Sequence, residues 1–140
     1  MVLKALVVDD DEMILDILEY ILKSDGYNIT RATDGDKAIK VLNAEDFDLV
    51  ITDLQMGSTS GLDVIRKTKD VNPATTVIMI TGSCDSSDEI EALHHGADDY
   101  LLKPFSPSDL LIRIQFQKYK QFFTSALTLE GEQRAANVSG

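Results

Sequence analysis

Four short apolar runs in this chain each end in a polar or charged residue. The runs cover residues 6–8, 49–52, 77–80 and 100–102, and they are followed by Asp9 and Asp10, by Asp53, by Thr81 and by Lys103. Uninterrupted runs rich in β-branched residues are typical of strands that are buried on both faces in a parallel sheet. Ligands of such sheets bind at the carboxyl ends of the strands. The sequence therefore predicts that carboxylates, a hydroxyl group and an ammonium group meet at one edge of a sheet.

Between the runs, apolar residues recur at the three-and-four spacing of amphipathic helices. Gly26 ends the first predicted helix, Asp34 caps the second, and the third stops before Pro73. Residues 27–32 form a weaker candidate strand between the first two helices. The predicted inward residues are Ile14, Ile17, Leu18, Ile21 and Leu22 in the first helix, Ala38, Val41, Leu42 and Ala44 in the second, and Leu62, Ile65 and Thr68 in the third.

Two more helices are predicted in the second half of the chain. Ser86 and Glu89 have the spacing of a capping box, which predicts a fourth helix with Ile90 and Leu93 facing inward and Gly96 at its end. Ser106 followed by Pro107 is the order that begins a fifth helix. Five strands alternating with five helices favour an α/β fold with a doubly wound parallel five-stranded sheet and helices on both faces. Periodicity alone leaves the order of the strands open.

Composition narrows the classes of function. The 140 residues fit one domain, and 24 acidic against 13 basic residues give a formal net charge of −11. This charge repels phosphate backbones and anionic membranes, so we expect direct binding neither to nucleic acid nor to a membrane. Cys84 is the single cysteine, which excludes an internal disulfide. Without an apolar run of about 18 residues or a signal segment, the expected location is cytoplasmic.

We expect the carboxylates of Asp9, Asp10 and Asp53 to meet at this edge of the predicted sheet, where their mutual repulsion must be offset by positive charge. Like charges about 4 Å apart repel by roughly 4 kcal/mol per pair at an effective dielectric constant near 20. Lys103 supplies one positive charge, and a hard divalent cation with oxygen ligands can balance the rest, so we predict a magnesium site. A carboxylate beside such an ion, facing an ammonium and a hydroxyl group, can act as a nucleophile toward phosphorus. The product would be an aspartyl phosphate.

Four sequence motifs occur in order along the chain, and they are Val7 to Glu12, Asp53 to Met56 with Gly61 after them, Thr81-Gly82, and Gly96 to Phe105. Together they resemble the receiver domains of two-component response regulators, and the chain is similar to the chemotaxis response regulator. The resemblance spans roughly residues 3–122. We therefore expect a receiver domain over residues 1–122, followed at 123–140 by a C-terminal helix extension and a flexible tail or linker. The resemblance implies a flavodoxin-like (βα)5 fold with strand order 2-1-3-4-5.

The resemblance also implies a role for each matching residue. Asp53 is the expected phosphoacceptor, and Asp10, Asp53 and the backbone carbonyl of Gln55 are the expected magnesium ligands. Asp9 is expected to hold the metal through water. The Thr81 hydroxyl is expected to turn toward the phosphoryl group, and the Lys103 ammonium is expected to pair with a phosphoryl oxygen. Tyr100 is the aromatic residue expected to change rotamer on activation. The peptide bond between Lys103 and Pro104 is expected to be cis.

By this resemblance, the chain is a bacterial, phosphorylation-dependent switch of a two-component phosphorelay. A sensor histidine kinase, a phosphotransfer protein or a small phosphodonor would supply the phosphoryl group, and a downstream protein target or effector domain would receive the signal. The protein would not be an enzyme beyond its own phosphorylation and dephosphorylation. Two alternatives are a receiver that binds partners without phosphorylation and an N-terminal regulatory fragment of a larger effector such as a transcription regulator. A magnesium-dependent phosphatase is disfavoured, because Asp53 lacks a second aspartate two positions away.

Two segments depart from the simplest receiver. Gly57 stands where the family usually has proline, so we expect the loop from Gly57 to Gly61 to be looser without magnesium. Near the end of the chain, Phe116, Tyr119 and Phe123, with Ile112 and Leu127, form a second apolar stripe besides Leu111 and Ile114. This stripe either folds back on its own domain or packs on a partner, and a homodimer is our hypothesis for the second case. The small and polar residues from Gly131 to Gly140 predict a loose tail.

Overall fold

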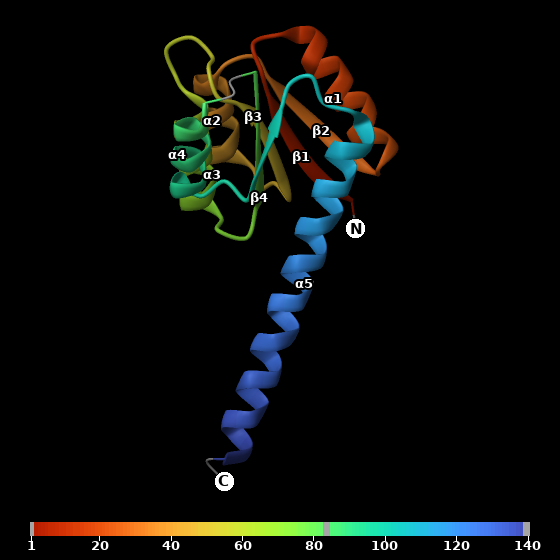
Figure 1. Cartoon of the computed structure of the whole chain (residues 1–140), viewed down its shortest axis with the longest axis vertical. Helices are drawn as coiled ribbons and strands as arrows, with labels where there is room; N and C mark the ends of the chain where they lie inside the picture. Colours follow the sequence, from red (N-terminus) through yellow and green to blue (C-terminus); the bar gives the residue numbers. More distant parts are fainter. Residues whose placement is uncertain (1, 83–84, 139–140) are drawn as a thin grey trace. The chain divides into compact units, whose positions relative to one another are not determined.

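The computed structural model describes residues 2–82 and 85–138, and it describes side chains as far as Leu127. The chain divides into two compact units, Met1–Phe105 and Ser106–Gly140. Among the described residues, the first unit holds five strands and four helices, and the second unit holds one long helix (Figure 1).

The elements of the first unit alternate strictly between strand and helix. In chain order they are β1 (Leu3–Val8), α1 (Glu12–Ser24), β2 (Tyr27–Ala32), α2 (Gly35–Ala44), β3 (Leu49–Asp53), α3 (Gly61–Val71), β4 (Thr76–Thr81), α4 (Ser86–His95) and β5 (Asp99–Leu102). All strand pairs are parallel, and the order in the sheet is β2-β1-β3-β4-β5. This flavodoxin-like topology confirms the predicted fold class, and the strand order is the one that the resemblance implies.

The register brings the carboxyl ends of four strands to one edge of the sheet. Val8 pairs with Thr52, Asp53 with Ile80, and Thr81 with Leu102. The last residues of neighbouring strands therefore lie within one residue of each other in the register. Because the strands are parallel, these carboxyl ends all lie at the same edge of the sheet. The polar residues that follow these strands are consequently neighbours at this edge.

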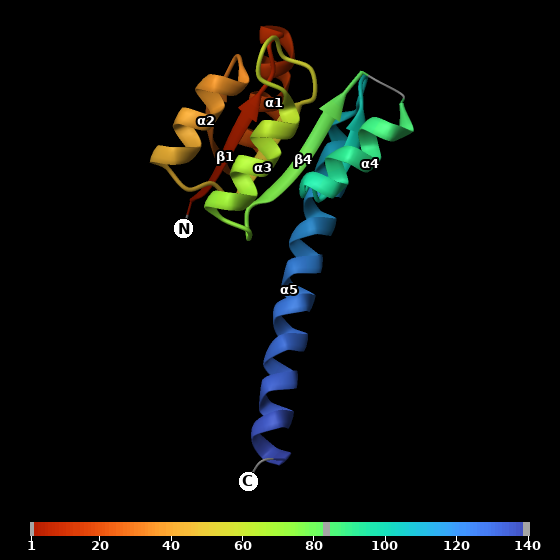
Figure 2. The same ribbon diagram turned by 90° about the vertical axis from the view of Figure 1, so that its left-hand side faces the viewer.

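Helices cover both faces of the sheet. The main core cluster lies between the sheet and the helices α2, α3 and α4, and it includes Leu6, Val50, Met79, Ile65 and Ala92. Helix α1 lies across the sheet from α2 and α3 (Figure 2). Strands β3 and β4, in the middle of the sheet, are buried along their whole length.

The buried face of α1 differs from the predicted face at Leu15 and at Ile17. Leu15 is buried together with Leu18, Ile21 and Leu22, whereas Ile17 is 41% exposed. The segment has so many apolar residues that helical spacing fits more than one face. Only the contact with the sheet selects among these faces, and the prediction for Ile17 was wrong.

The predicted inward face of α4 was also wrong. Ile90 and Leu93 are 66% and 47% exposed, and Ala92 is the buried residue of this helix. The N-cap is Asp85, not Ser86, because the Asp85 side chain accepts a hydrogen bond from the backbone N–H of Ser87. Gly96 ends the helix as predicted, in the left-handed conformation with a φ of 115°.

The second unit consists of α5 (Pro107–Val138), a helix of 32 residues. As predicted, Ser106 caps its start, since the Ser106 hydroxyl oxygen accepts a hydrogen bond from the N–H of Asp109 at 3.1 Å. The helix continues to Val138, through most of the segment from Gly131 in which we expected a loose tail. Glutamate, glutamine, arginine and alanine in this segment are strong helix formers, which outweighs the single glycine. The proposed domain boundary at residue 122 stays a prediction.

None of the helices in the described residues has both the length and the hydropathy that crossing a membrane requires.

Candidate functional site

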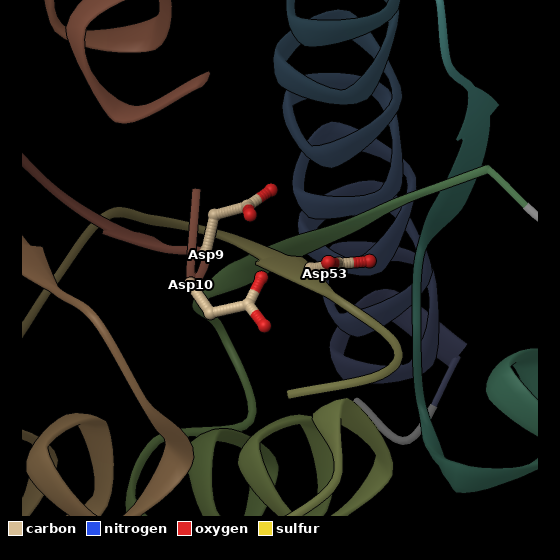
Figure 3. Close-up of side chains that lie close together, drawn as sticks. All are labelled: Asp9, Asp10 and Asp53. Carbon is tan, nitrogen blue, oxygen red and sulfur yellow. The ribbon is translucent and has the colours of Figure 1, made fainter. Parts of the chain in front are cut away.

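Three carboxylates lie together at the carboxyl edge of the sheet. Asp9 and Asp10 directly follow β1, and Asp53 is the last residue of β3. Each of them offers an oxygen atom, and these three atoms all lie within 4.8 Å of one another (Figure 3). Asp9 and Asp53 are buried, whereas Asp10 is exposed. The structure therefore joins the acids that the sequence placed at two separate strand ends.

Lys103 bridges the two buried acids. Its Nζ atom lies 2.8 Å from Oδ2 of Asp9 and 3.4 Å from Oδ2 of Asp53. The other carboxylate oxygens accept backbone hydrogen bonds, from the N–H of Asp11 to Asp9 at 2.9 Å and from the N–H of Leu54 to Asp53 at 2.7 Å. The closer contact to Asp9, a residue 94 positions away in the sequence, was not predicted.

Burial is the largest influence on the pKa of Asp53. Removal from water raises the pKa of Asp53, and the neighbouring charge of Asp9 raises it further, while Lys103 and the N–H of Leu54 act in the opposite direction. For Lys103, burial acts to lower the pKa, but the hydrogen bond to Asp9 and the charges of both acids outweigh it, so its pKa is raised. Lys103 is therefore a firmly held cation beside a carboxylate that ionises less readily than usual.

Thr81 and Tyr100 belong to β4 and β5, the last two strands. Thr81 ends β4 and is buried, and its carbonyl oxygen accepts a hydrogen bond from the N–H of Lys103 at 2.8 Å. This bond fixes the start of the Lys103 side chain next to Thr81. Tyr100 is partly buried against the core cluster between the sheet and α2 to α4. The peptide bond between Lys103 and Pro104 is cis, as expected from the resemblance.

The loop after Asp53 is anchored to its surroundings despite its missing proline. Gln55 is exposed, but Met56 is buried, and the Thr59 hydroxyl donates a hydrogen bond to Asp36 at the start of α2. A Cβ atom on Gly35 would lie only 2.6 Å from the Thr59 side chain, so the close approach requires glycine there. At the end of the loop, the N–H of Gly61 donates to the carbonyl oxygen of Leu54 at 2.7 Å. Sequence reasoning missed the contact between Thr59 and Asp36.

The donor set suits a hard cation. Three carboxylates share one lysine, so the cluster keeps an excess of negative charge, and all of its ligand atoms are oxygens. This is the chemistry that Mg²⁺ and Ca²⁺ prefer. Asp11, which follows the cluster in the sequence, caps α1 by accepting a hydrogen bond from the N–H of Met13. Ser83 and Cys84 lie outside the described residues.

Solved structures with this fold include several receiver domains. A receiver domain protein (CheY-like) from Methanospirillum hungatei matches with a TM-score of 0.83 and 30% sequence identity, over 89% of this chain and 99% of that chain. A response regulator from Burkholderia pseudomallei, solved with a phosphorylated aspartic acid, a calcium ion and citrate, matches with a TM-score of 0.77 and 31% identity. That match covers 89% of this chain and 74% of the other. The fold and the acidic edge thus define a CheY-like signalling domain.

Sequence comparison leads to the same class. The family model of the response regulator receiver domain matches residues 5–115. The chain is 41% identical over 108 residues to the response regulator SaeR of Staphylococcus epidermidis, which covers 77% of this chain and 47% of that protein. It is 35% identical over 112 residues to the transcriptional regulatory protein PhoP of Bacillus subtilis, covering 80% and 47%. The chain belongs to the response regulator receiver family, and it spans about half the length of these curated relatives.

Proposed function

We propose that this chain is a phosphorylation switch that accepts a phosphoryl group on Asp53 with the help of Mg²⁺. The observation that carries the proposal is the grouping of Asp9, Asp10 and Asp53 around Lys103 at the carboxyl edge of a receiver fold. Receivers are not classical enzymes, so the proposed chemistry is one stoichiometric transfer followed by hydrolysis. The solved relative with a phosphorylated aspartic acid and a calcium ion supports both the modification and a divalent ion.

In the proposed transfer, a carboxylate oxygen of Asp53 attacks the phosphorus atom of a phosphohistidine. A new P–O bond forms as the P–N bond breaks, and the imidazole leaves with the bonding electrons and takes up a proton. Asp10, Asp53 and the carbonyl of Gln55 would hold the metal directly and Asp9 would hold it through water. Bound there, Mg²⁺ would offset the negative charge that gathers on the phosphoryl oxygens.

Lys103, Thr81 and Tyr100 each have a separate proposed role. The Lys103 ammonium, 3.4 Å from Oδ2 of Asp53, would pair with a phosphoryl oxygen once the transfer is complete. The Thr81 hydroxyl would turn toward the same group, and Tyr100 would follow with a change of rotamer. Phosphorylation adds about two negative charges at the site, which is the input that drives this change.

The proposed partners are a sensor histidine kinase or phosphotransfer protein upstream and an effector downstream. Relatives named as transcriptional regulators support an effector of that kind. Since the chain spans about half of such relatives, we propose that the effector is either a further domain of the same polypeptide or a separate protein. The net charge of −11 argues against direct contact of this chain with DNA.

The test is intact mass after incubation with acetyl phosphate or phosphoramidate, with and without Mg²⁺. We expect a single phosphoryl adduct that requires Mg²⁺ and is absent in Asp53→Asn. Asp11→Asn is the matched control, because it removes a neighbouring negative charge but keeps a good N-cap, and it should still be labelled. Absence of an adduct in the unmodified protein under every condition would instead favour a receiver that binds partners without phosphorylation.

A further inference from the structure

The exposed apolar side chains of α5 follow the spacing of a coiled-coil seam. Ile112, Phe116, Tyr119 and Phe123 are separated by four, three and four residues, and each is at least 49% exposed. This alternation is the a/d pattern by which two helices interlock. The rings of Tyr119 and Phe123 already contact each other, with centroids 5.1 Å apart. We call these four residues the aromatic seam.

Between Gln115 and Leu127, the exposed large apolar side chains all lie in the aromatic seam or directly beside it. Phe122 and Leu127 flank the seam, at the g and e positions of the heptad, and both are exposed. Ala126 occupies the next d position. All other side chains from 115 to 127 are polar, namely Gln115, Gln117, Lys118, Lys120, Gln121, Thr124 and Ser125. A narrow stripe with polar surroundings fits one other helix better than a broad protein surface.

We propose that the aromatic seam binds a second copy of this chain as a parallel, in-register coiled coil. The positive charge of the helix favours the parallel over the antiparallel arrangement. Between Asp109 and Glu130 the helix has three basic residues and no acidic one. In a parallel pair, g positions face e positions, which places Gln115 opposite Lys120 of the second copy and Phe122 opposite Leu127. In an antiparallel pair, e faces e, and Lys120 would meet a basic residue of the other helix.

The area of the seam is sufficient for such a pair. A fully covered aromatic side chain buries roughly 150–250 Å². With half or more of each surface exposed, the seam and its two flanking residues could bury about 600 Å² per copy, or about 1,200 Å² in the pair, which is the lower end of specific interfaces. We therefore expect a dimer at micromolar concentrations. The proposal does not depend on phosphorylation of Asp53.

Sedimentation of the full chain at tens of micromolar, without a phosphodonor, tests the dimer. The unmodified chain should sediment as a dimer, and the double variant Phe116→Glu with Phe123→Glu should weaken dimerisation at least tenfold. The matched control is Gln121→Glu with Ser125→Glu, which adds the same charge at exposed positions off the seam and should leave the dimer intact. Circular dichroism checks that both variants keep their helix. A monomeric unmodified chain, or a dimer that survives the seam substitutions, overturns the proposal.

Disulfide trapping tests the parallel register. In a Cys84→Ser background, Tyr119→Cys places identical cysteines face to face at a d position, whereas Ser125→Cys places them on the outside. Mild oxidation should cross-link the first variant at least ten times more efficiently than the second. Equal cross-linking of the two variants, or none in the first, would contradict the in-register arrangement. Mass after acetyl phosphate treatment reports separately on the Asp53 chemistry.

Discussion

Two partly buried lysines, Lys69 of α3 and Lys103 after β5, hold aspartates at opposite edges of the sheet, and the two clusters differ in how well their charges are matched. Lys69, at the amino edge of β4, pairs with Asp98 at 2.8 Å and donates to the carbonyl oxygen of Thr75 at 2.6 Å. Asp98 also accepts from the N–H of Val77. At the carboxyl edge, Lys103 alone faces Asp9 and Asp53, with Asp10 beside them.

The difference separates a structural ion pair from a binding site. The amino-edge pair has one acid for one lysine and further hydrogen bonds to the backbone, so it is complete as it stands. The carboxyl-edge cluster has more negative than positive charge and is stabilised further by a cation. Substitutions at the two edges should therefore differ in their effect on stability and in their response to Mg²⁺.

The largest expected effect is that of the two lysine substitutions. Lys69→Met leaves Asp98 without its cation and should lower the free energy of unfolding by about 2–3 kcal/mol. This loss is smaller than that expected for breaking a fully buried ion pair, because both side chains are partly exposed. Lys103→Met should also destabilise the protein, but Mg²⁺ should restore much of the loss because the ion can take over the neutralising role. Urea unfolding with and without Mg²⁺ measures both. Equal rescue of the two variants by Mg²⁺ would remove the distinction between the edges.

Neutralising one acid at each edge should change stability in opposite directions. Asp53→Asn removes a like charge from an overcrowded cluster, so we expect a gain of about 1 kcal/mol without Mg²⁺. Asp98→Asn weakens the matched pair with Lys69 and should cost about 1–2 kcal/mol. Thermal unfolding of both variants in metal-free buffer checks the signs. A loss of stability in Asp53→Asn would mean that its contact with Lys103 outweighs its repulsion from Asp9.

The gain from Asp53→Asn should depend on pH. Because burial raises the pKa of Asp53, the folded state holds this proton to higher pH than the unfolded state, and stability falls as pH rises through that interval. Below the unfolded value of about 3.9 the carboxyl is protonated in both states, so its charge has no effect there. The difference between Asp53→Asn and the unmodified protein should grow with pH and level off above the raised pKa. Urea midpoints in metal-free buffers from about pH 4 to about pH 8 measure it. A difference that shrinks with rising pH would contradict the assigned direction.

The sequence predicted the parts of the molecule that depend on local pattern. The strand runs, the cap at Asp34 and the end of α4 at Gly96 all lie where they were expected. The grouping of Asp9, Asp10 and Asp53 followed from parallel strand ends, although their chemical roles stay predictions. These features share one cause, which is that each is determined within a single element or by the common direction of the strands.

The errors concern the contacts between elements. The exposed sides of α1 and α4 were misassigned because several faces of each helix satisfy the same spacing, and only the sheet decides among them. The bond from Thr59 to Asp36 joins residues 23 positions apart and leaves no periodic trace in the sequence. The choice of Asp9 as the closer partner of Lys103 likewise depends on positions that only the folded sheet defines.

The smallest expected effect concerns the loop that follows Asp53. We predicted that this loop is looser without Mg²⁺ because Gly57 replaces a proline, yet the Thr59 hydroxyl ties it to Asp36. Thr59→Val keeps the shape of the side chain but removes this hydrogen bond, and it should cost about 0.5–1 kcal/mol. Backbone relaxation of residues 57–61 should then show more motion in metal-free Thr59→Val than in the unmodified protein.

Thr33→Val is the matched control for the loop, because it removes a hydroxyl that accepts from Lys37, next to the same end of α2, without touching the loop. Adding Mg²⁺ should reduce the loop motion in both proteins if the ion orders the loop through the Gln55 carbonyl. Equal order with and without the ion would reject the prediction that magnesium tightens the loop. Unchanged motion in Thr59→Val would mean that buried Met56 and the bond from Gly61 to Leu54 hold the loop by themselves.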